Sequence, residues 1–162
     1  MNQQNISLFT DFFTIPILKA SENFSAKQYK DSMFLGEIDP QTQLRQGRGV
    51  CRYTNGRHFE GFWEKDKRHG KGFELFSNGN SYYGDFRFGK VHGKGFYKWR
   101  NGDTYSGEWQ QGLKHGQGTW KNANGDSYAG QWQNNAANGF GIHVWQNGDK
   151  YEGEWRENLR HG

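Results

Sequence analysis

A 23-residue period constrains this chain more than any other feature of its sequence. An aromatic residue opens each period, a glycine follows two positions later, and a second aromatic residue follows four positions later. Repetition at a fixed spacing is typical of repeat architectures, in which each unit packs only on its neighbours. We therefore expect one elongated stack of similar units. The opening and second aromatic residues are Phe59 and Trp63, Tyr82 and Phe86, Tyr105 and Trp109, Tyr128 and Trp132, and Tyr151 and Trp155.

The composition predicts a thin core built from rings. Only 32% of the 162 residues are hydrophobic, but 17% are aromatic and 24 residues are glycine. Each aromatic side chain buries roughly 150–250 Å² and packs with a defined geometry. The net charge of +4 is modest, so it permits acidic partners without requiring them. The single Cys51 excludes an internal disulfide framework and favours a reducing, cytoplasmic location.

Alternation along the opening segment of each unit predicts a β-strand. Residues two apart in a strand point to the same face, so Tyr105, Gly107 and Trp109 share one face. A glycine between two aromatic residues leaves bare backbone that rings from neighbouring strands can cover. A second strand is expected to start at the His-Gly pair of each unit, with its glycines two residues apart on one face.

An Asn-Gly pair follows the second strand of every unit. Between extended segments this pair is the strongest short-range signal of a hairpin, because both residues tolerate the positive φ of a type I′ turn. Each unit is therefore expected to join the next through such a turn. The pairs are Asn55-Gly56, Asn78-Gly79, Asn101-Gly102, Asn124-Gly125 and Asn147-Gly148.

The predicted fold class is all-β: an elongated, twisted, single-layer antiparallel meander of about eleven or twelve strands. Residues 1–33 form a short N-terminal extension outside the period, and residues 34–162 form the repeat array. A degenerate unit at 34–58 opens the array, because its glycines fit the later columns of the period. Full units start at residues 59, 82, 105 and 128, and a truncated unit starts at 151.

The N-terminal extension allows two interpretations. It is a disordered terminus, or a docking segment that covers the sheet or a partner. Ser25 followed by Gln28 matches a capping box, so a short helix could run through Met33. Asp11 and Pro16 interrupt its apolar stretch, so we expect neither a signal peptide nor a membrane span. The candidate docking residues are Phe9, Phe12, Phe13, Ile15 and Leu18.

The residues from Tyr105 to Gly118, YSGEWQQGLKHGQG, resemble the MORN repeat, and the resemblance covers about residues 34 to 162. It implies a non-catalytic scaffold that tethers protein partners at membranes, in the cytoskeleton or in ciliary axonemes, with an amphipathic helix sometimes lying in the groove. Similar repeats precede phosphoinositide kinase or lysine methyltransferase domains, so a targeting or regulatory module of a larger enzyme is the alternative. The departures from the motif are Phe59, Phe86, Asp66, Asn135, Asn138 and Asn158.

Nothing in the sequence predicts catalysis, a cofactor or a metal site. Histidines recur at one position of the unit, but equivalent positions lie two strands apart, about 10 Å, so turn capping is the favoured interpretation. Recurrent carboxylates such as Glu108 and Glu154 are expected to face water. Gly84 to Lys90 matches the start of a phosphate loop, but Val91 replaces the required hydroxyl residue and no helix follows. The recurring histidines are His69, His92, His115 and His161.

Two candidate binding surfaces remain. The first is the aromatic face, whose curvature would form a groove for a partner helix: Tyr82, Tyr105, Trp109, Tyr128, Trp132, Tyr151 and Trp155. The second is a basic edge of turns that could bind acidic partners or an anionic membrane, at about 1 kcal/mol per residue: Lys65, Lys67, Arg68, Lys71, Lys90, Lys94 and Lys114. Nucleic acid is not expected as a partner, because no nucleic-acid module is present.

The last unit stops at Gly162, where its second strand should begin. A sheet that ends there exposes an unpaired strand. We therefore expect a longer parent protein, edge-to-edge self-association, or a partner in a larger complex that supplies the next strand.

Overall fold

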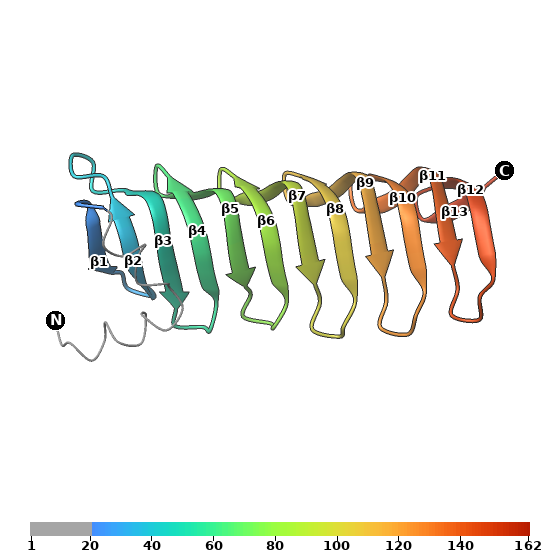
Figure 1. Ribbon diagram of the computed structural model, residues 1–162, viewed down its shortest axis with the longest axis horizontal. Coiled ribbons are helices and arrows are strands. Elements are labelled where there is room, and N and C mark those ends of the chain that lie inside the picture. The colour runs from blue at the N-terminus through green and yellow to red at the C-terminus, as the bar shows by residue number, and fades with distance from the viewer. Residues whose placement is uncertain (1–20) are drawn as a thin grey trace.

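The computed structural model describes residues 21–162, which form one antiparallel sheet of 13 strands in sequential order (Figure 1). This confirms the all-β meander, with slightly more strands than expected. Residues 21–162 contain no helix, and therefore no helix among them could cross a membrane. The candidate docking residues between Phe9 and Leu18 lie outside the described residues. The strands are β1 (Phe24–Gln28), β2 (Ser32–Ile38), β3 (Arg45–Tyr53), β4 (His58–Glu64), β5 (Lys67–Leu75), β6 (Ser81–Arg87), β7 (Lys90–Lys98), β8 (Thr104–Gln110), β9 (Leu113–Lys121), β10 (Ser127–Gln133), β11 (Ala136–Val144), β12 (Lys150–Arg156) and β13 (Leu159–His161).

The short helix predicted from Ser25 through Met33 is wrong. Residues 24–28 form β1, which pairs with β2 and extends the sheet by one strand. Phe24 and Ala26 alternate along β1 and pack against the buried Leu35 and Val50. The burial of alternate residues outweighs the capping-box signal, because a single turn of helix would bury less apolar surface than this strand does.

Two kinds of turn alternate along the sheet, and the type I′ turns are not at the Asn-Gly pairs. Lys65 and Asp66 both have positive φ and form a two-residue loop between β4 and β5, as a type I′ turn requires. At the Asn-Gly loops only the glycine has positive φ: Gly56 (φ 85°) donates its N–H to the Tyr53 carbonyl oxygen at 3.1 Å. These longer loops lie along the lower edge of Figure 1, and the two-residue turns lie along the upper edge.

The departures from the repeat motif at the two-residue turns have a physical explanation. Asn135 and Asn158 occupy the second turn position with φ of 73° and 67°, which asparagine tolerates. Each side chain also accepts a backbone N–H from the preceding unit, Asn135 from Lys114 at 2.8 Å and Asn158 from Ala137 at 2.7 Å. The Asn134-Asn135 turn is therefore an ordinary member of the series, and the altered turn suggested by the sequence at 135–138 is not found.

Paired glycines create the space in which the opening aromatic ring of each unit lies. Gly84 in β6 faces Gly95 in β7. A Cβ atom added at Gly84 would lie 2.5 Å from the Gly95 Cα and 2.5 Å from the Tyr82 hydroxyl oxygen. The Tyr82 ring therefore covers bare backbone, as the glycine pattern predicted.

The aromatic rings form one continuous zigzag along one face of the sheet, called the aromatic face below. Tyr105 packs edge-on against Trp109 of its own unit, with ring centroids 5.0 Å apart, and against Trp132 of the next unit at 5.2 Å. Trp132 donates its indole N–H to the Gly118 carbonyl oxygen at 3.0 Å, and Tyr105 donates its hydroxyl to the Glu108 carbonyl oxygen at 3.0 Å. Each unit thus completes the core of its neighbour.

Candidate partner-binding face

The rings predicted as a binding face are mostly the core of the sheet. Tyr82 and Tyr105 are fully buried, and Trp132 is only 7% exposed. Trp109, Tyr128 and Trp155 are also buried, and Tyr151 near the end is half-buried. Their role in binding a partner stays a prediction, and the surface above them is formed largely by other side chains.

Two further columns cover the aromatic face, and they change from unit to unit. We call them the variable columns. In the N-terminal units they include the buried Glu74, whereas in the C-terminal units they carry the half-buried rings of Trp120 and Trp145. The side chains of these two columns therefore differ between units, whereas the rings beneath them recur. The columns are Cys51, Glu74, Tyr97, Trp120 and His143, and Tyr53, Phe76, Trp99, Asn122 and Trp145.

A third column carries cations onto the aromatic face. Sequence reasoning missed it because β5 begins at Lys67, two residues before the His-Gly pair, so Arg68 belongs to a strand and not to a turn. A 23-residue recurrence of basic residues was the available signal. We call this position of the repeat the cation column, although two units carry an uncharged residue there. Its residues are Arg45, Arg68, Val91, Lys114, Ala137 and Arg160.

In the first unit the column's cation is neutralised by the chain itself. The Arg45 guanidinium stacks over Trp63, 4.0 Å from the ring centroid, and bonds both carboxylate oxygens of Asp66 at 2.6 and 3.0 Å. Burial works to raise the pKa of Asp66, but the hydrogen bonds and charge of Arg45 lower it below its ordinary value. The pair is bidentate and therefore geometrically specific.

In the next unit a buried carboxylate holds two arginines. Glu74 is 1% exposed and accepts hydrogen bonds from Arg57, at 2.5 Å, and from Arg68. Arg68 also donates to the Gly89 carbonyl oxygen at 2.5 Å and lies 5.4 Å from the centroid of the Phe86 ring. Burial, followed by the charge of Arg57, lowers the pKa of Arg68, against the raising effect of Glu74. Removing one member of such a buried network leaves a costly unpaired charge.

The C-terminal cations have no such partner. Lys114 Nζ lies 4.2 Å from the centroid of the Trp132 ring, and burial lowers the pKa of its ammonium group. The Arg160 guanidinium lies 5.6 Å from the centroids of the Trp145 and Tyr151 rings. Among residues 21–162, no carboxylate forms an ion pair with Lys114 or Arg160.

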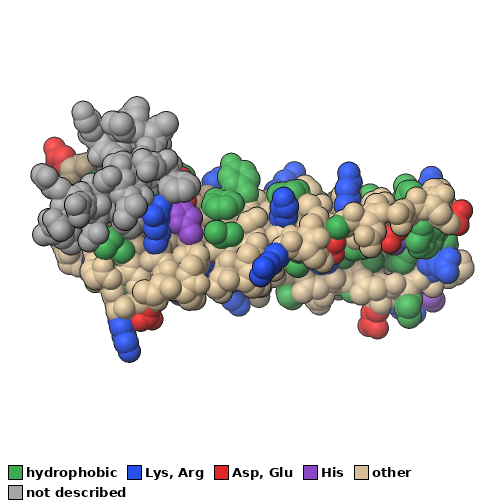
Figure 2. Space-filling model, turned by 90° about the horizontal axis from the view of Figure 1, so that it is seen from below, with side chains coloured by type: hydrophobic (Ala, Val, Ile, Leu, Met, Phe, Trp, Pro, Cys, Tyr) green, Lys and Arg blue, Asp and Glu red, His purple; other side chains and the backbone are tan. Residues whose placement is uncertain are grey.

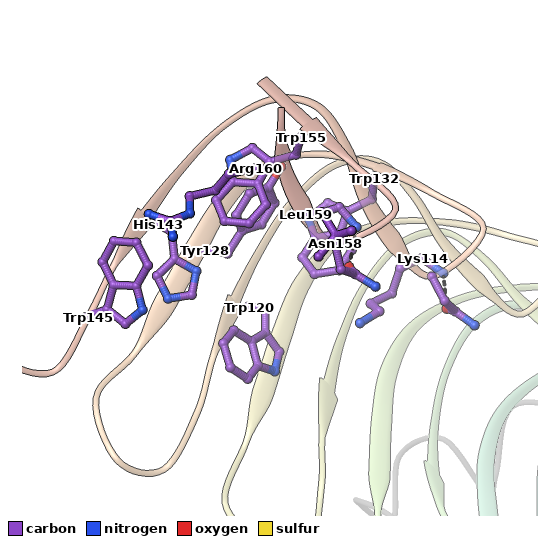
Figure 3. Close-up of a pocket in the computed structure, with 12 residues that line it drawn as sticks. Lys114, Trp120, Tyr128, Trp132, His143, Trp145, Trp155, Asn158, Leu159 and Arg160 are labelled. Carbon is purple, nitrogen blue, oxygen red and sulfur yellow. Dashed lines mark hydrogen bonds between the residues drawn. The ribbon is translucent and has the colours of Figure 1, made fainter. Parts of the chain in front are cut away.

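A pocket of about 450 Å³ opens between these two cations (Figure 3). Figure 3 shows Lys114 at one end, and Arg160 with His143 and Trp145 at the other. Ala137 stands in the cation column at this point, so no long side chain fills the space. The lining holds cations, rings and amides but no carboxylate: Lys114, Trp120, Tyr128, Trp132, Asn135, Ala137, His143, Trp145, Trp155, Asn158, Leu159 and Arg160.

The structure does not gather the residues of the predicted basic edge on one surface, and their role in binding stays a prediction. Lys65, Lys67 and Lys90 lie at or beside the two-residue turns, whereas Arg68 and Lys114 lie over the aromatic face. Strand alternation sends Lys71 and Lys94 to the opposite face, called the outer face, where Lys71 pairs with Asp85 at 2.7 Å. Figure 2 shows lysine and arginine side chains spread along the slab.

The recurring histidines lie beside the two-residue turns. His92 Nδ1 accepts the backbone N–H of Gln111 at 3.5 Å, which confirms turn capping at that histidine. The Nδ1 atoms of His69 and His115 are buried without a hydrogen-bond partner among the described residues. His161 is exposed in β13. Within residues 21–162, no three His, Cys, Asp or Glu side chains gather as metal ligands.

Of the comparisons with known proteins, the match of the repeats to a family model is the informative one. Among solved structures, a similar one is the TCP domain of SAS-4 (dCPAP) from Drosophila melanogaster, in complex with a proline-rich motif of Ana2 (dSTIL). It is 14% identical with a TM-score of 0.30, covering 89% of this chain and 97% of that one. No curated protein matches. The family model described as MORN repeat matches residues 44–56, 59–81, 82–104, 105–127, 128–150 and 151–162. This chain belongs to the MORN-repeat family.

Proposed function

We propose that this chain is a non-catalytic scaffold that holds protein partners on its aromatic face, within a cytoplasmic assembly that is cytoskeletal, ciliary or close to a membrane. MORN repeats are a protein-interaction module. The observation that carries the proposal is that conserved spacing and variation fall on different side chains of this face. The repeated rings build the core, and the variable columns above them differ from unit to unit.

The backbone supports a scaffold because neighbouring units are tied to each other at both edges. At the two-residue turns, Gly112 donates its N–H to the Val91 carbonyl oxygen of the preceding unit at 2.9 Å. At the Asn-Gly loops, Gln146 donates its N–H to the Asp126 carboxylate of the preceding unit at 2.8 Å. Such ties fix the spacing of anything bound along the sheet.

Glu74 and Cys51, two groups on the aromatic face that could perform chemistry, are occupied or buried. Both carboxylate oxygens of Glu74 bond to arginines, and Cys51 is fully buried in β3. This supports binding over catalysis, whether the array acts alone or beside an enzyme domain. The lipid-binding alternative rested on a concentrated basic edge, and the distribution of the lysines over both faces removes that support.

The test is partner capture by proximity labelling in the native cell, with variants on the two faces. Trp120→Ser and Trp145→Ser change half-buried rings on the aromatic face. Tyr83→Ser and Phe96→Ser change exposed rings on the outer face and are the matched controls. We expect the aromatic-face variants to lose partners that the outer-face variants retain, with thermal unfolding confirming that all four fold. Loss only with the outer-face variants, or no protein partner with any chain, contradicts the proposal.

A further inference from the structure

The outer face carries exposed apolar rings near the middle of the sheet. Tyr83 in β6 is 61% exposed, and it pairs across the strands with Phe73 in β5 and Phe96 in β7, which are also exposed. We call these three residues the ring row. Single exposed rings are ordinary on a protein surface, but a contiguous group of them indicates an interaction site.

A row of alternating charges runs beside the ring row. Its members lie at one level of four successive strands, and we call them the charge row: Lys71 in β5, Asp85 in β6, Lys94 in β7 and Glu108 in β8. Lys71 Nζ pairs with Asp85 at 2.7 Å, and the backbone N–H of Lys94 donates to the Asp85 carboxylate at 3.0 Å. A pocket of about 410 Å³ is lined by members of both rows, so the two rows share one surface.

The charge row is complementary to its own reversed copy. A second copy of the chain can face this surface with its strand order reversed about a two-fold axis that runs along the strands, between β6 and β7. Asp85 of each copy then faces Lys94 of the other, and Lys71 of each copy faces Glu108 of the other. Every charge of the two rows therefore meets an opposite charge.

This alignment is also favoured over its neighbours. A slip of one strand, with β6 over β6, places Asp85 opposite Asp85 and Lys71 opposite Lys94, and these like charges repel each other. A slip of two strands leaves either Lys71 or Lys94 without a facing carboxylate. In the matched alignment Tyr83 faces Phe96 of the other copy, so the two ring rows meet at the centre.

We propose that two copies of this chain associate face to face through their outer faces, with the two-fold axis between β6 and β7. Packed sheets lie about 10 Å apart with strand directions within about 30° of each other, a separation that facing lysine and carboxylate side chains bridge. Both aromatic faces then point away from the interface, and the edges of both sheets stay free. The inference is independent of the proposed scaffold function and of the edge pairing expected from the last strand.

The area of the matched surface sets the expected strength. The axis places β4 to β9 of one copy over the same strands of the other. At about 4.8 Å per strand and about 3.3 Å per residue over a strand of about seven residues, this surface offers roughly 670 Å² per copy. Stable interfaces bury about 800 Å² per partner, so we expect a reversible dimer with micromolar affinity.

Sedimentation velocity of the full chain across the micromolar range tests the association. We expect a species of twice the 18.8 kDa of one chain to grow with concentration. Tyr83→Ser removes a ring at the centre and should weaken the dimer at least about tenfold. Phe140→Ser is the matched control, because Phe140 is an exposed ring of the same face in β11, beyond the matched strands. A chain that stays monomeric at every concentration, or equal weakening by both variants, overturns the proposal.

Charge reversal separates matched pairing from non-specific association of exposed rings. Lys71→Glu and Glu108→Lys each place like charges opposite each other in the dimer, so each variant alone should associate at least about tenfold more weakly. Both side chains are exposed, so neither change removes core packing. An equimolar mixture of the two variants restores both facing pairs and should associate as the wild type does. Wild-type association of either variant alone, or no recovery in the mixture, contradicts the charge matching.

The same variants keep this inference apart from the scaffold proposal. Because the aromatic faces stay open in the dimer, Tyr83→Ser should lose the dimer and retain the partners captured by proximity labelling. A wild-type dimer that captures no partner supports the interface and removes the scaffold. A monomeric wild type that captures partners on its aromatic face removes the interface and supports the scaffold.

Discussion

The N-terminal and C-terminal halves of the aromatic face have the same strand arrangement, but they differ in whether their cations pair with carboxylates of the described chain. In the N-terminal half, Arg45 and Arg68 pair with Asp66 and Glu74, so the charges close on themselves. In the C-terminal half, Lys114 and Arg160 have no carboxylate partner in the described chain, and a pocket lies between them. A few side chains above an unchanged core therefore decide whether a segment of the repeat closes on its own charges or leaves a pocket open.

Breaking the closed half at its centre should have the largest effect. Glu74→Gln leaves the Arg57 and Arg68 guanidinium groups without their carboxylate, so we expect a loss of about 3 kcal/mol in the free energy of unfolding. Urea denaturation at pH 7 measures it. Glu152→Gln, an exposed carboxylate in the open half, is the control and should change stability by less than about 0.5 kcal/mol. Comparable losses in both variants would contradict the description of Glu74 as a buried charge centre.

The repeated core should be equally sensitive in both halves. A Cβ at Gly61 would lie 2.6 Å from the Gly72 Cα, and a Cβ at Gly107 would lie 2.5 Å from the Gly118 Cα. Because backbone cannot yield cheaply, Gly61→Ala and Gly107→Ala should each cost about 2 kcal/mol in urea denaturation. Gly112→Asn, at a turn position where asparagine occurs in later units, is the control with little expected change. A large difference between the two alanine variants would show that the halves also differ in their core.

Converting the open half into the closed form should be mildly stabilising. In Ala137→Arg, the guanidinium can stack on Trp155 and donate to Asn158, as Arg45 does with Trp63 and Asp66. Cation–π contacts at partly exposed sites contribute about 0.5 to 1 kcal/mol, so we expect thermal unfolding to shift upward slightly. A marked downward shift would mean that the pocket at Ala137 cannot accept the column's usual side chain.

Acid should weaken the open half before the closed half, with the smallest effect of the four. Burial lowers the pKa of His143 below 6.5, so the unfolded chain binds a proton that the folded chain resists, and stability falls as the pH drops below 6.5. The lowered pKa of Asp66 contributes stability above 3.8 that is lost only as the pH falls below that value toward its folded pKa.

Urea denaturation at stepped pH tests this order. His143→Gln should flatten the decline in stability between about pH 6.5 and 5, and Asp66→Asn should change the profile only below about pH 4. A decline above pH 5 that is identical in wild type and His143→Gln would remove His143 from the account.

The sequence predicted the repeated features well because each has a single physical solution. The spacing of Tyr105, Gly107 and Trp109 admits only a strand that places rings over glycines, and the structure confirms it. Sequence reasoning failed where two solutions compete. Asn55-Gly56 fits a type I′ turn and also a longer loop that needs positive φ only at glycine, and the sequence alone does not choose between them.

The pocket could not be predicted for a different reason. Its position depends on where β9 begins, because a strand that starts two residues before the His-Gly pair moves Lys114 from a turn into a strand. Strand boundaries are the least certain part of any interpretation from sequence. The absence of a long side chain at Ala137 acquires meaning only once its column is known.

The ties between successive turns limit how such an array can change. Because Gly89 and Gly112 each bond backbone to backbone with the unit before them, a binding feature cannot slide continuously along the sheet. Duplication or loss of a whole unit moves such a feature by about 10 Å, and because each unit has two antiparallel strands, the feature keeps its orientation. An evolving or engineered array of this kind would thus place its partners on a discrete lattice of sites.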